Sequence, residues 1–227
     1  MKTQSITVLI VALSAWGCLS GCALLSKSSP ITPRYFTPDL SPNAGQASSV
    51  AQSGQKLRVG SIKAGPHLRE RMAYRTSEQE VAYYNERRWT ERPEAYLARA
   101  LSRSLFEEYG FVRAISGASH TLDAELVAFE EIKTEDHLVR VVVVINLYDM
   151  EGGHLQRTVT DEREVEGKKN EPEAVVRALA DALHAVVSEI AEITSEHLAQ
   201  SSAGTEEDAG GEDVSDENSS EDPGLEG

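Results

Sequence analysis

Cysteine is nearly absent from this chain of 227 residues, and its two cysteines, Cys18 and Cys22, lie four residues apart near the N-terminus. A structural zinc site takes four ligands, and no further cysteine or dense histidine cluster follows to supply them. A disulfide that closed so short a loop would add little stability. The spacing therefore argues against both a metal site and a disulfide bond.

Catalytic motifs are also missing. None of the six histidines has another at i, i+4, and the chain contains neither His-Glu-x-x-His nor Gly-x-Ser-x-Gly. The segment 21–28 has nearly the spacing of a phosphate-binding loop, but Ser26 replaces the second glycine and no strand precedes it. We interpret the acids of residues 129–136 as solvated carboxylates at a strand end and turn. We therefore expect no enzyme, and any ATP-driven function must take its energy from another chain.

The segment before Cys22 has the features of a bacterial lipoprotein signal. Lys2 is followed by an apolar run, residues 6–16, which is too short to span a bilayer permanently. Residues 19–22, Leu-Ser-Gly-Cys, are similar to a lipobox, whereas bulky Trp16 does not suit one that ends at Cys18. The resemblance implies a diacylglyceryl group on the Cys22 thiol and an acylated new N-terminus. Ala23 follows the cysteine where an inner-membrane retention signal would place Asp, which favours the outer membrane.

The formal net charge of −15 comes mostly from the C-terminus. From Gly204 onward the chain has ten acids and no base, so the rest carries about −5. Such a tail lacks the apolar residues that would offset its ordering entropy. We expect it to be disordered and solvated, with capture of a basic partner or of divalent cations as the alternative. The acidic charge argues against nucleic-acid binding.

Alternating and helical patterns predict the elements of one folded domain. We expect a short edge strand at 35–37 and strands at 57–62, 121–134, 138–150 and 155–165, together with a hairpin over 72–85. Two apolar stripes predict helices, one opened by a capping Thr90 and the other running from Asn170 to about Leu198. The predicted fold is α+β, a mostly antiparallel sheet of about six strands with two helices on one face. The predicted domains are a signal peptide (1–21), a lipidated tether and linker with a short first strand (22–56), the α+β domain (57–200) and the acidic tail (201–227).

Several of these features recur together in one known family. The lipobox is followed by Tyr-x5-Ser-Pro at 35–42 and then by strand, proline link, hairpin, tryptophan and a Leu/Arg helix. The residues that carry this order are Pro66, Leu68, Arg69, Arg75, Tyr83, Tyr84, Trp89, Leu97 and Leu101. Over residues 18–200 the chain resembles the ABC-type transport auxiliary lipoproteins, the PqiC-like components of MCE-type lipid transport systems. The long linker at 43–55 and the acidic tail depart from the family pattern.

The resemblance implies a role and a set of partners. It implies a non-catalytic lipoprotein on the periplasmic face of the outer membrane, working beside an MCE-domain protein and an ABC permease and ATPase, often as a homo-oligomer. Tyr74, Tyr83, Tyr84 and Trp89 are candidate contacts to a partner or lipid, or else core and subunit packing. Alternation places Tyr83 and Tyr84 on opposite faces of the sheet. The alternatives are an assembly or binding factor for another envelope machine and, third, an envelope hydrolase.

We expect Cys22→Ala to leave an uncleaved precursor without lipid, because the thiol is the acceptor of the diacylglyceryl group. Mass spectrometry of the purified chain measures both properties. A variant that is processed like the wild type would refute the lipobox assignment, and Cys18→Ala is the matched control that should mature normally.

Overall fold

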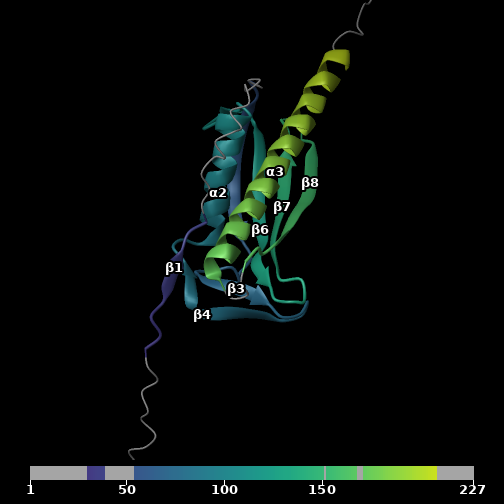
Figure 1. The fold of residues 1–227 in the computed structure, drawn as a ribbon. Helices are drawn as coiled ribbons and strands as arrows, with labels where there is room; N and C mark the ends of the chain where they lie inside the picture. The colour runs from purple at the N-terminus through teal and green to yellow at the C-terminus, as the bar shows by residue number, and fades with distance from the viewer. Residues whose placement is uncertain (1–29, 39–53, 151, 168–170, 209–227) are drawn as a thin grey trace, which may run out of the picture. The chain divides into compact units, whose positions relative to one another are not determined.

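The computed structural model describes residues 30–38, 54–150, 152–167 and 171–208. The chain divides into two units, residues 1–33 and residues 34–227, and the sheet and both helices belong to the second (Figure 1). The predicted signal peptide, Cys22, the predicted cap Asn170 and the tail beyond Asp208 lie outside the described residues.

Among the described residues of the second unit, eight strands, two α-helices and one π-helical segment follow one another. They are β1 (Arg34–Phe36), β2 (Lys56–Ala64), β3 (Arg71–Arg75), β4 (Val81–Trp89), α2 (Pro93–Arg103), the π-helical η2 (Ser104–Glu108), β5 (Val112–Arg113), β6 (His120–Ile132), β7 (Leu138–Tyr148), β8 (His154–Glu164) and α3 (Pro172–Asp208).

The long strand β6 organises the sheet. One edge of β6 pairs with β7 along its length, and β7 pairs in turn with β8. The other edge is shared: β2 pairs with its first half and β3 with its last three residues. The sheet therefore forks beside β6 into one branch with β2 and β5 and another with β3, β4 and β1.

The prediction of a mostly antiparallel sheet of about six strands is confirmed only in part, because the sheet is mixed and larger. Among the described residues it has eight strands, and four of its seven pairings are parallel, although the long ladders of β6 with β7 and of β7 with β8 are antiparallel. Parallel neighbours need a crossover, and α2 supplies one between the β3–β4 hairpin and β6. The two-residue β5 was not predicted, because so short a strand has no period to detect.

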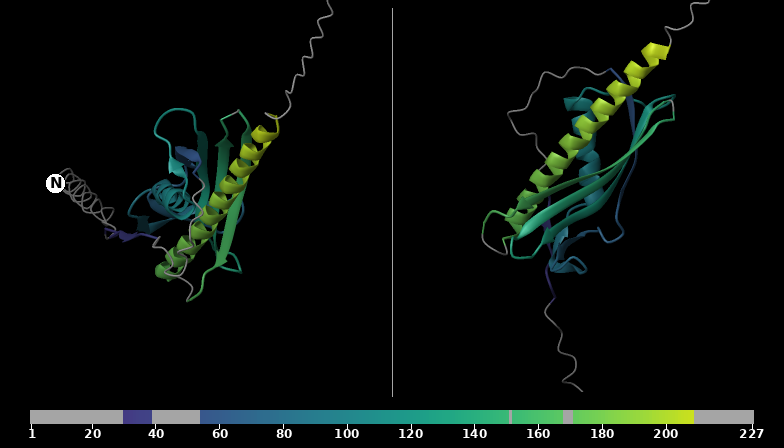
Figure 2. Two further views of the ribbon diagram at one scale, coloured as in Figure 1. Left: turned by 90° about the horizontal axis from the view of Figure 1, so that it is seen from above. Right: turned by 90° about the vertical axis from the view of Figure 1, so that its right-hand side faces the viewer.

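Both helices cover one face of the sheet, as predicted (Figures 1 and 2). Helix α3 packs over β7 and β8, α2 packs over β2, and the two helices touch each other. Every second residue of β7, from Val139 to Leu147, is fully buried on this face, while the residues between are half-buried. The second face of β7 is therefore only partly covered.

An extra residue in β6 changes which side chains reach the core. The pairing with β7 shifts at Val127, where β6 bulges. Before the bulge Leu122, Ala124 and Leu126 face the helices. After it Phe129 takes that face, where its ring lies 5.1 Å from that of Trp89, and Ala128 takes the open face. The bulge therefore gives Ala128 and Phe129 the opposite faces to those that uninterrupted alternation from Leu122 would give them.

The helix ends differ from the prediction in two places. Arg92 rather than Thr90 is the N-cap of α2, and the Thr90 hydroxyl instead lies 2.9 Å from the Tyr96 hydroxyl. Helix α3 runs past the expected end near Leu198 to Asp208, so residues 201–208 are helical and not disordered. Within the part of the chain that the structure describes, no helix has the length and apolar content needed to cross a membrane.

A second bulge, in β2, requires a glycine. Register shifts between Val59 and Ile62, and the Asp123 carboxylate accepts a 2.6 Å hydrogen bond from the Ser61 amide inside the bulge. A Cβ added to Gly60 would lie 2.3 Å from the Oδ1 of Asp123. The backbone at Gly60 thus approaches a carboxylate that is itself held in place.

We expect Gly60→Ala to lower the free energy of unfolding by about 1–2 kcal/mol, because the methyl group must displace Asp123 from the bulge. Chemical denaturation measures the change. In an Asp123→Ala background the same substitution should cost less, since the clashing oxygen is gone. An equal cost in both backgrounds would contradict this account.

Candidate functional site: the β3–β4 hairpin

The hairpin of β3 and β4 carries the aromatic residues singled out from the sequence. The ring of Tyr74 lies 4.7 Å from that of Tyr84, whereas the Tyr83 hydroxyl donates to the carbonyl of His67 at 3.1 Å. Tyr83 and Tyr84 therefore point to opposite sides of the hairpin, as alternation predicts. All three tyrosines are half-buried, so each keeps a part of its ring accessible.

Trp89 is set apart from the three tyrosines. It is 2% exposed and lies between α2 and β6, with its ring 6.0 Å from that of Tyr96 and 5.1 Å from that of Phe129. Its place is therefore in the core, which was one of the two interpretations of the sequence.

A buried carboxylate holds the helix side of the hairpin. The Glu131 side chain is 1% exposed and accepts a 2.5 Å hydrogen bond from the Tyr84 hydroxyl. His137 Nε2 lies 2.7 Å from its other oxygen, and Arg87 Nη1 lies 4.0 Å from the oxygen that Tyr84 contacts. The Glu131 carboxylate thus joins three separate segments, namely β4, β6 and the turn after β6. Burying a charged group without such partners would cost too much free energy.

The environment of Tyr84 favours its neutral phenol. Burial raises the pKa of Tyr84 above its usual range, and the hydrogen bond to the Glu131 carboxylate raises that pKa further. The charge of Arg87 acts in the opposite direction but is a weaker influence. Tyr84 is therefore a hydrogen-bond donor to Glu131 throughout the neutral range.

Cations lie over the rings of the three tyrosines. The Arg87 guanidinium carbon lies 3.9 Å from the centre of the Tyr84 ring, and Lys133 Nζ lies 4.4 Å from Tyr84 and 4.6 Å from Tyr74. On the other side Arg71 lies 5.5 Å from the Tyr83 ring. Such contacts contribute about 0.5–2 kcal/mol each. They hold the rings in fixed positions and give the hairpin a surface that is both aromatic and cationic.

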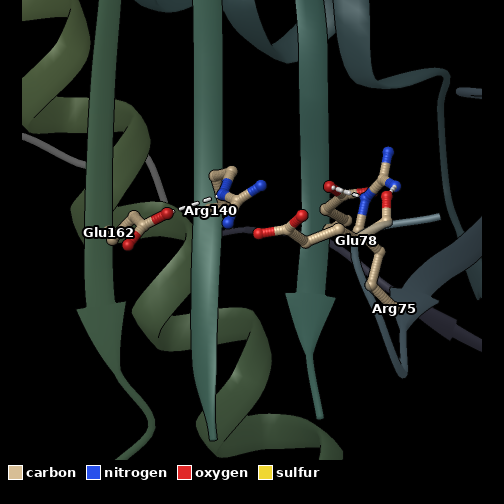
Figure 3. Close-up of polar contacts among 5 residues, drawn as sticks. Arg75, Glu78, Arg140 and Glu162 are labelled. Atoms are coloured by element: carbon tan, nitrogen blue, oxygen red, sulfur yellow. Dashed lines mark hydrogen bonds and ion pairs between the residues drawn. The ribbon is translucent and has the colours of Figure 1, made fainter. Parts of the chain in front are cut away.

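A row of charges crosses the open face beside the hairpin (Figure 3). Arg140 on β7 bonds Glu162 on β8 at 2.6 Å, and Arg75 on β3 bonds Glu130 on β6 at 2.6 Å. Arg140 is directly opposite both Glu162 and Glu130 in the ladder, so positive and negative residues alternate over four strands. Arg75 also donates to the carbonyl of Glu78 at 2.8 Å, which ties the hairpin turn to the sheet.

The sequence interpretation of Glu130 and Glu131 as solvated carboxylates is wrong. Each is 1% exposed, and the two point to opposite faces because they are neighbours on one strand. The prediction treated residues 129–136 as a strand end, whereas β6 continues to Ile132 with β3 and β7 on its two sides. The available signal was a pair of acids inside a strand pattern, whereas the Arg- and Tyr-rich hairpin that neutralises them is distant in the sequence.

Other parts of the described chain offer less. No group of three or more His, Cys, Asp or Glu side chains is placed to hold a metal ion among the residues that the structure describes. A hollow beside α2 and η2 is lined by Ala98, Arg99, Ala100, Ser102, Arg103 and Glu107, and it contains none of the predicted residues.

Comparison with protein families identifies the class of this chain. The model of the ABC-type transport auxiliary lipoprotein component matches residues 39–191. The match covers well over half of the 227 residues, so the chain belongs to this family. It includes the whole β3–β4 hairpin and all four aromatic candidates. No curated protein matches the chain.

Solved structures share the fold. Protein XCC0632 from Xanthomonas campestris is 21% identical with a TM-score of 0.62, and the match covers 76% of this chain and 99% of that one. A second crystal structure, of an uncharacterized protein, is 17% identical with a TM-score of 0.55, covering 71% and 97% of the two chains. A minor lipoprotein from Acinetobacter baumannii is 12% identical with a TM-score of 0.40, covering 63% and 94%. At these identities the first two likenesses show the fold.

We expect Tyr84→Phe to destabilise the domain by about 1.5–3 kcal/mol at neutral pH, since it removes a donor from a buried carboxylate. Folded Tyr84 also holds its proton more tightly than an unfolded tyrosine, whose pKa is about 10. The free energy of unfolding should therefore fall as the pH rises above about 10, and it should fall less steeply in the variant.

Chemical denaturation between about pH 8 and about pH 11 measures both effects. Tyr35→Phe is the matched control, because Tyr35 is 62% exposed and should leave the alkaline slope as in the wild type. An alkaline slope that is the same in the wild type and in Tyr84→Phe would contradict the role given to Tyr84.

Proposed function

We propose that this protein is a non-catalytic lipoprotein accessory of an MCE/ABC-type system that transports phospholipid or another lipophile. The observation that carries the proposal is the family match over residues 39–191, because an auxiliary component works beside a transporter made of other chains. The proposed partners are an MCE-domain protein and an ABC permease and ATPase. The lack of a phosphate-binding loop in the sequence supports a division of labour in which those chains supply the energy.

We place the protein at the outer membrane with its folded domain on the periplasmic side, where it docks the conduit at the membrane. The lipobox at 19–22 and Ala23 support this assignment. Stable anchoring takes about two acyl chains or more, and a lipidated and N-acylated Cys22 would carry three. In this arrangement the protein is tethered to the bilayer by its lipid and makes its specific contacts through the domain.

The β3–β4 hairpin is the proposed contact surface. It presents the half-buried Tyr74, Tyr83 and Tyr84, with Arg71 and Lys133 beside their rings. Tyrosine and arginine are enriched among the residues that dominate binding energies. Because Glu131 and the cations fix these rings before binding, little side-chain entropy is lost when a partner docks. We also propose that the protein is a homo-oligomer.

The test is affinity purification of the tagged lipoprotein from its native envelope in mild detergent, with mass spectrometry of the proteins that accompany it. We expect an MCE-domain protein together with an ABC permease and ATPase. Recovery of a different envelope machine, without these chains, would refute the transport function and favour an assembly or binding factor.

Two variants separate the anchor from the contact surface. Cys22→Ala should lose membrane attachment and hence the accompanying chains. Tyr83→Ala should stay lipidated and folded but recover less of its partners, because it removes an anchor ring from the hairpin. Tyr35→Ala, an exposed aromatic residue outside the hairpin, is the matched control and should behave like the wild type. Thermal unfolding of each variant shows whether a loss of partners reflects a loss of fold.

A further inference from the structure

Strand β8 leaves a long edge of the sheet unpaired. Within the described residues β8 pairs with β7 alone, so its outer edge presents the backbone of His154–Glu164 without a neighbouring strand. The sheet's other outer strands, β1 and β5, are three and two residues long. Proteins generally keep exposed edges short, since an open ladder of amides and carbonyls invites another strand. The eleven-residue edge of β8 is the longest open edge among the described strands, although β5 covers only two residues of β2 and β1 only three of β4.

The face of β8 that lies on the side of the helices is only partly buried. Of the five residues on this face only Val159 is buried, and Leu155 and Asp161 are half-buried. Arg157 and Arg163, on the same face, are exposed. On β7, which has neighbours on both sides, every residue of this face is buried. The lower burial of β8 is expected for a strand that has a neighbour on only one side.

The charges along β8 are complementary to the same strand run in reverse. A second β8 laid antiparallel about Val159 would place residue 157 opposite 161 and residue 154 opposite 164. Arg157 would then face Asp161, and His154 would face Glu164, once in each half of the two-fold pair. Moving the centre to Thr160 would instead place Arg157 opposite Arg163. Like charges opposite each other destabilise a sheet and opposite charges stabilise it, so the pattern selects the register centred on Val159.

In the single chain, the side chains of Arg157 and Asp161 are both placed to form this pair. Arg157 is exposed and its printed hydrogen bond goes to the carbonyl of its own neighbour, Gln156, at 3.0 Å. Asp161 is held by Arg163 at 2.6 Å, which fixes its carboxylate on the same face. A second Arg157 arriving across the edge would meet a carboxylate that is already oriented.

The helices do not obstruct this pairing. Helix α3 packs over both β7 and β8 (Figure 1). Its axis then lies about one strand spacing, or ~5 Å, from the new interface. Two copies of α3 on the same side of a joined sheet would be ~10 Å apart, close to the ~8–10 Å at which helices pack against each other, so they would touch across the interface without overlapping.

We propose that the β8 edge is a self-association surface, on which a second copy of this chain pairs antiparallel about Val159 and joins the two sheets into one. Charge complementarity identifies the occupant as the same strand. The proposal assigns residues to the homo-oligomer named under the proposed function, and it holds whatever lipid or transporter the protein serves.

Charge reversal tests the register directly. Arg157→Asp and Asp161→Arg each place like charges opposite each other twice in the two-fold pair. We expect each variant alone to associate at least about tenfold more weakly than the wild type. An equal mixture of the two restores an opposite charge at every 157–161 pair and should recover association. Sedimentation velocity of the full lipoprotein in mild detergent measures these states, singly and mixed.

The design separates misfolding from loss of the interface. A variant that failed to fold would not recover on mixing, and thermal unfolding checks each chain. Lys63→Asp is the matched control, because it reverses an exposed charge on β2 away from the edge. A wild type that stays monomeric, an oligomer that Arg157→Asp leaves intact, or variants that fail to recover on mixing would each overturn the proposal. The readout is self-association of the purified chain, so its result does not depend on the outcome of the envelope purification.

Discussion

The fold depends on one constraint: a single edge of β6 has to pair with two different strands, β2 and β3. Its first half must bury Leu122 and Leu126 beneath α2 and α3, and its last residues must pair with β3. The bulge at Val127 meets both needs, because one extra residue exchanges the faces of all that follow. Phe129 thereby reaches the core, and Glu131 follows it onto the same side.

The acids at the end of β6 explain why the hairpin is a fixed part of the domain. Glu131 and Glu130 are adjacent, so one is bonded by Tyr84 and His137 on the helix side and the other by Arg75 on the open side. A buried charge that loses a partner is costly, so the hairpin cannot detach on either side without exposing or stranding a carboxylate. The rings that form the proposed contact surface are thus positioned by side chains that are themselves buried in the sheet.

Much of the fold was predictable because it follows local periods. The strands at 57–62, 121–134, 138–150 and 155–165 and both helices were placed from alternation and apolar stripes, and the family followed from the order of motifs. The parallel pairings were not predictable, since a single sequence carries no information on which strands become neighbours. The exchange of faces at Val127 was missed because a bulge leaves no mark in an alternating pattern.

The same limits apply to the candidate site. Alternation was enough to separate Tyr83 from Tyr84, and the structure places them on opposite sides. It could not reveal the partners of Glu131, because Tyr84 and His137 come from segments whose proximity is set by the tertiary fold. Lipidation at Cys22 remains a prediction from the sequence.

The length of α3 has a consequence for how the domain comes apart. Buried residues follow one another along this helix from Pro172 to Leu198, and they contact β7, β8 and α2. Peeling away either end would expose core from more than one element, so partial opening should be rare and unfolding cooperative up to Leu198. From there the backbone continues as helix to Asp208, about 15 Å at 1.5 Å per residue. One continuous helical backbone therefore joins the part of α3 that packs against the sheet to its C-terminal end at Asp208.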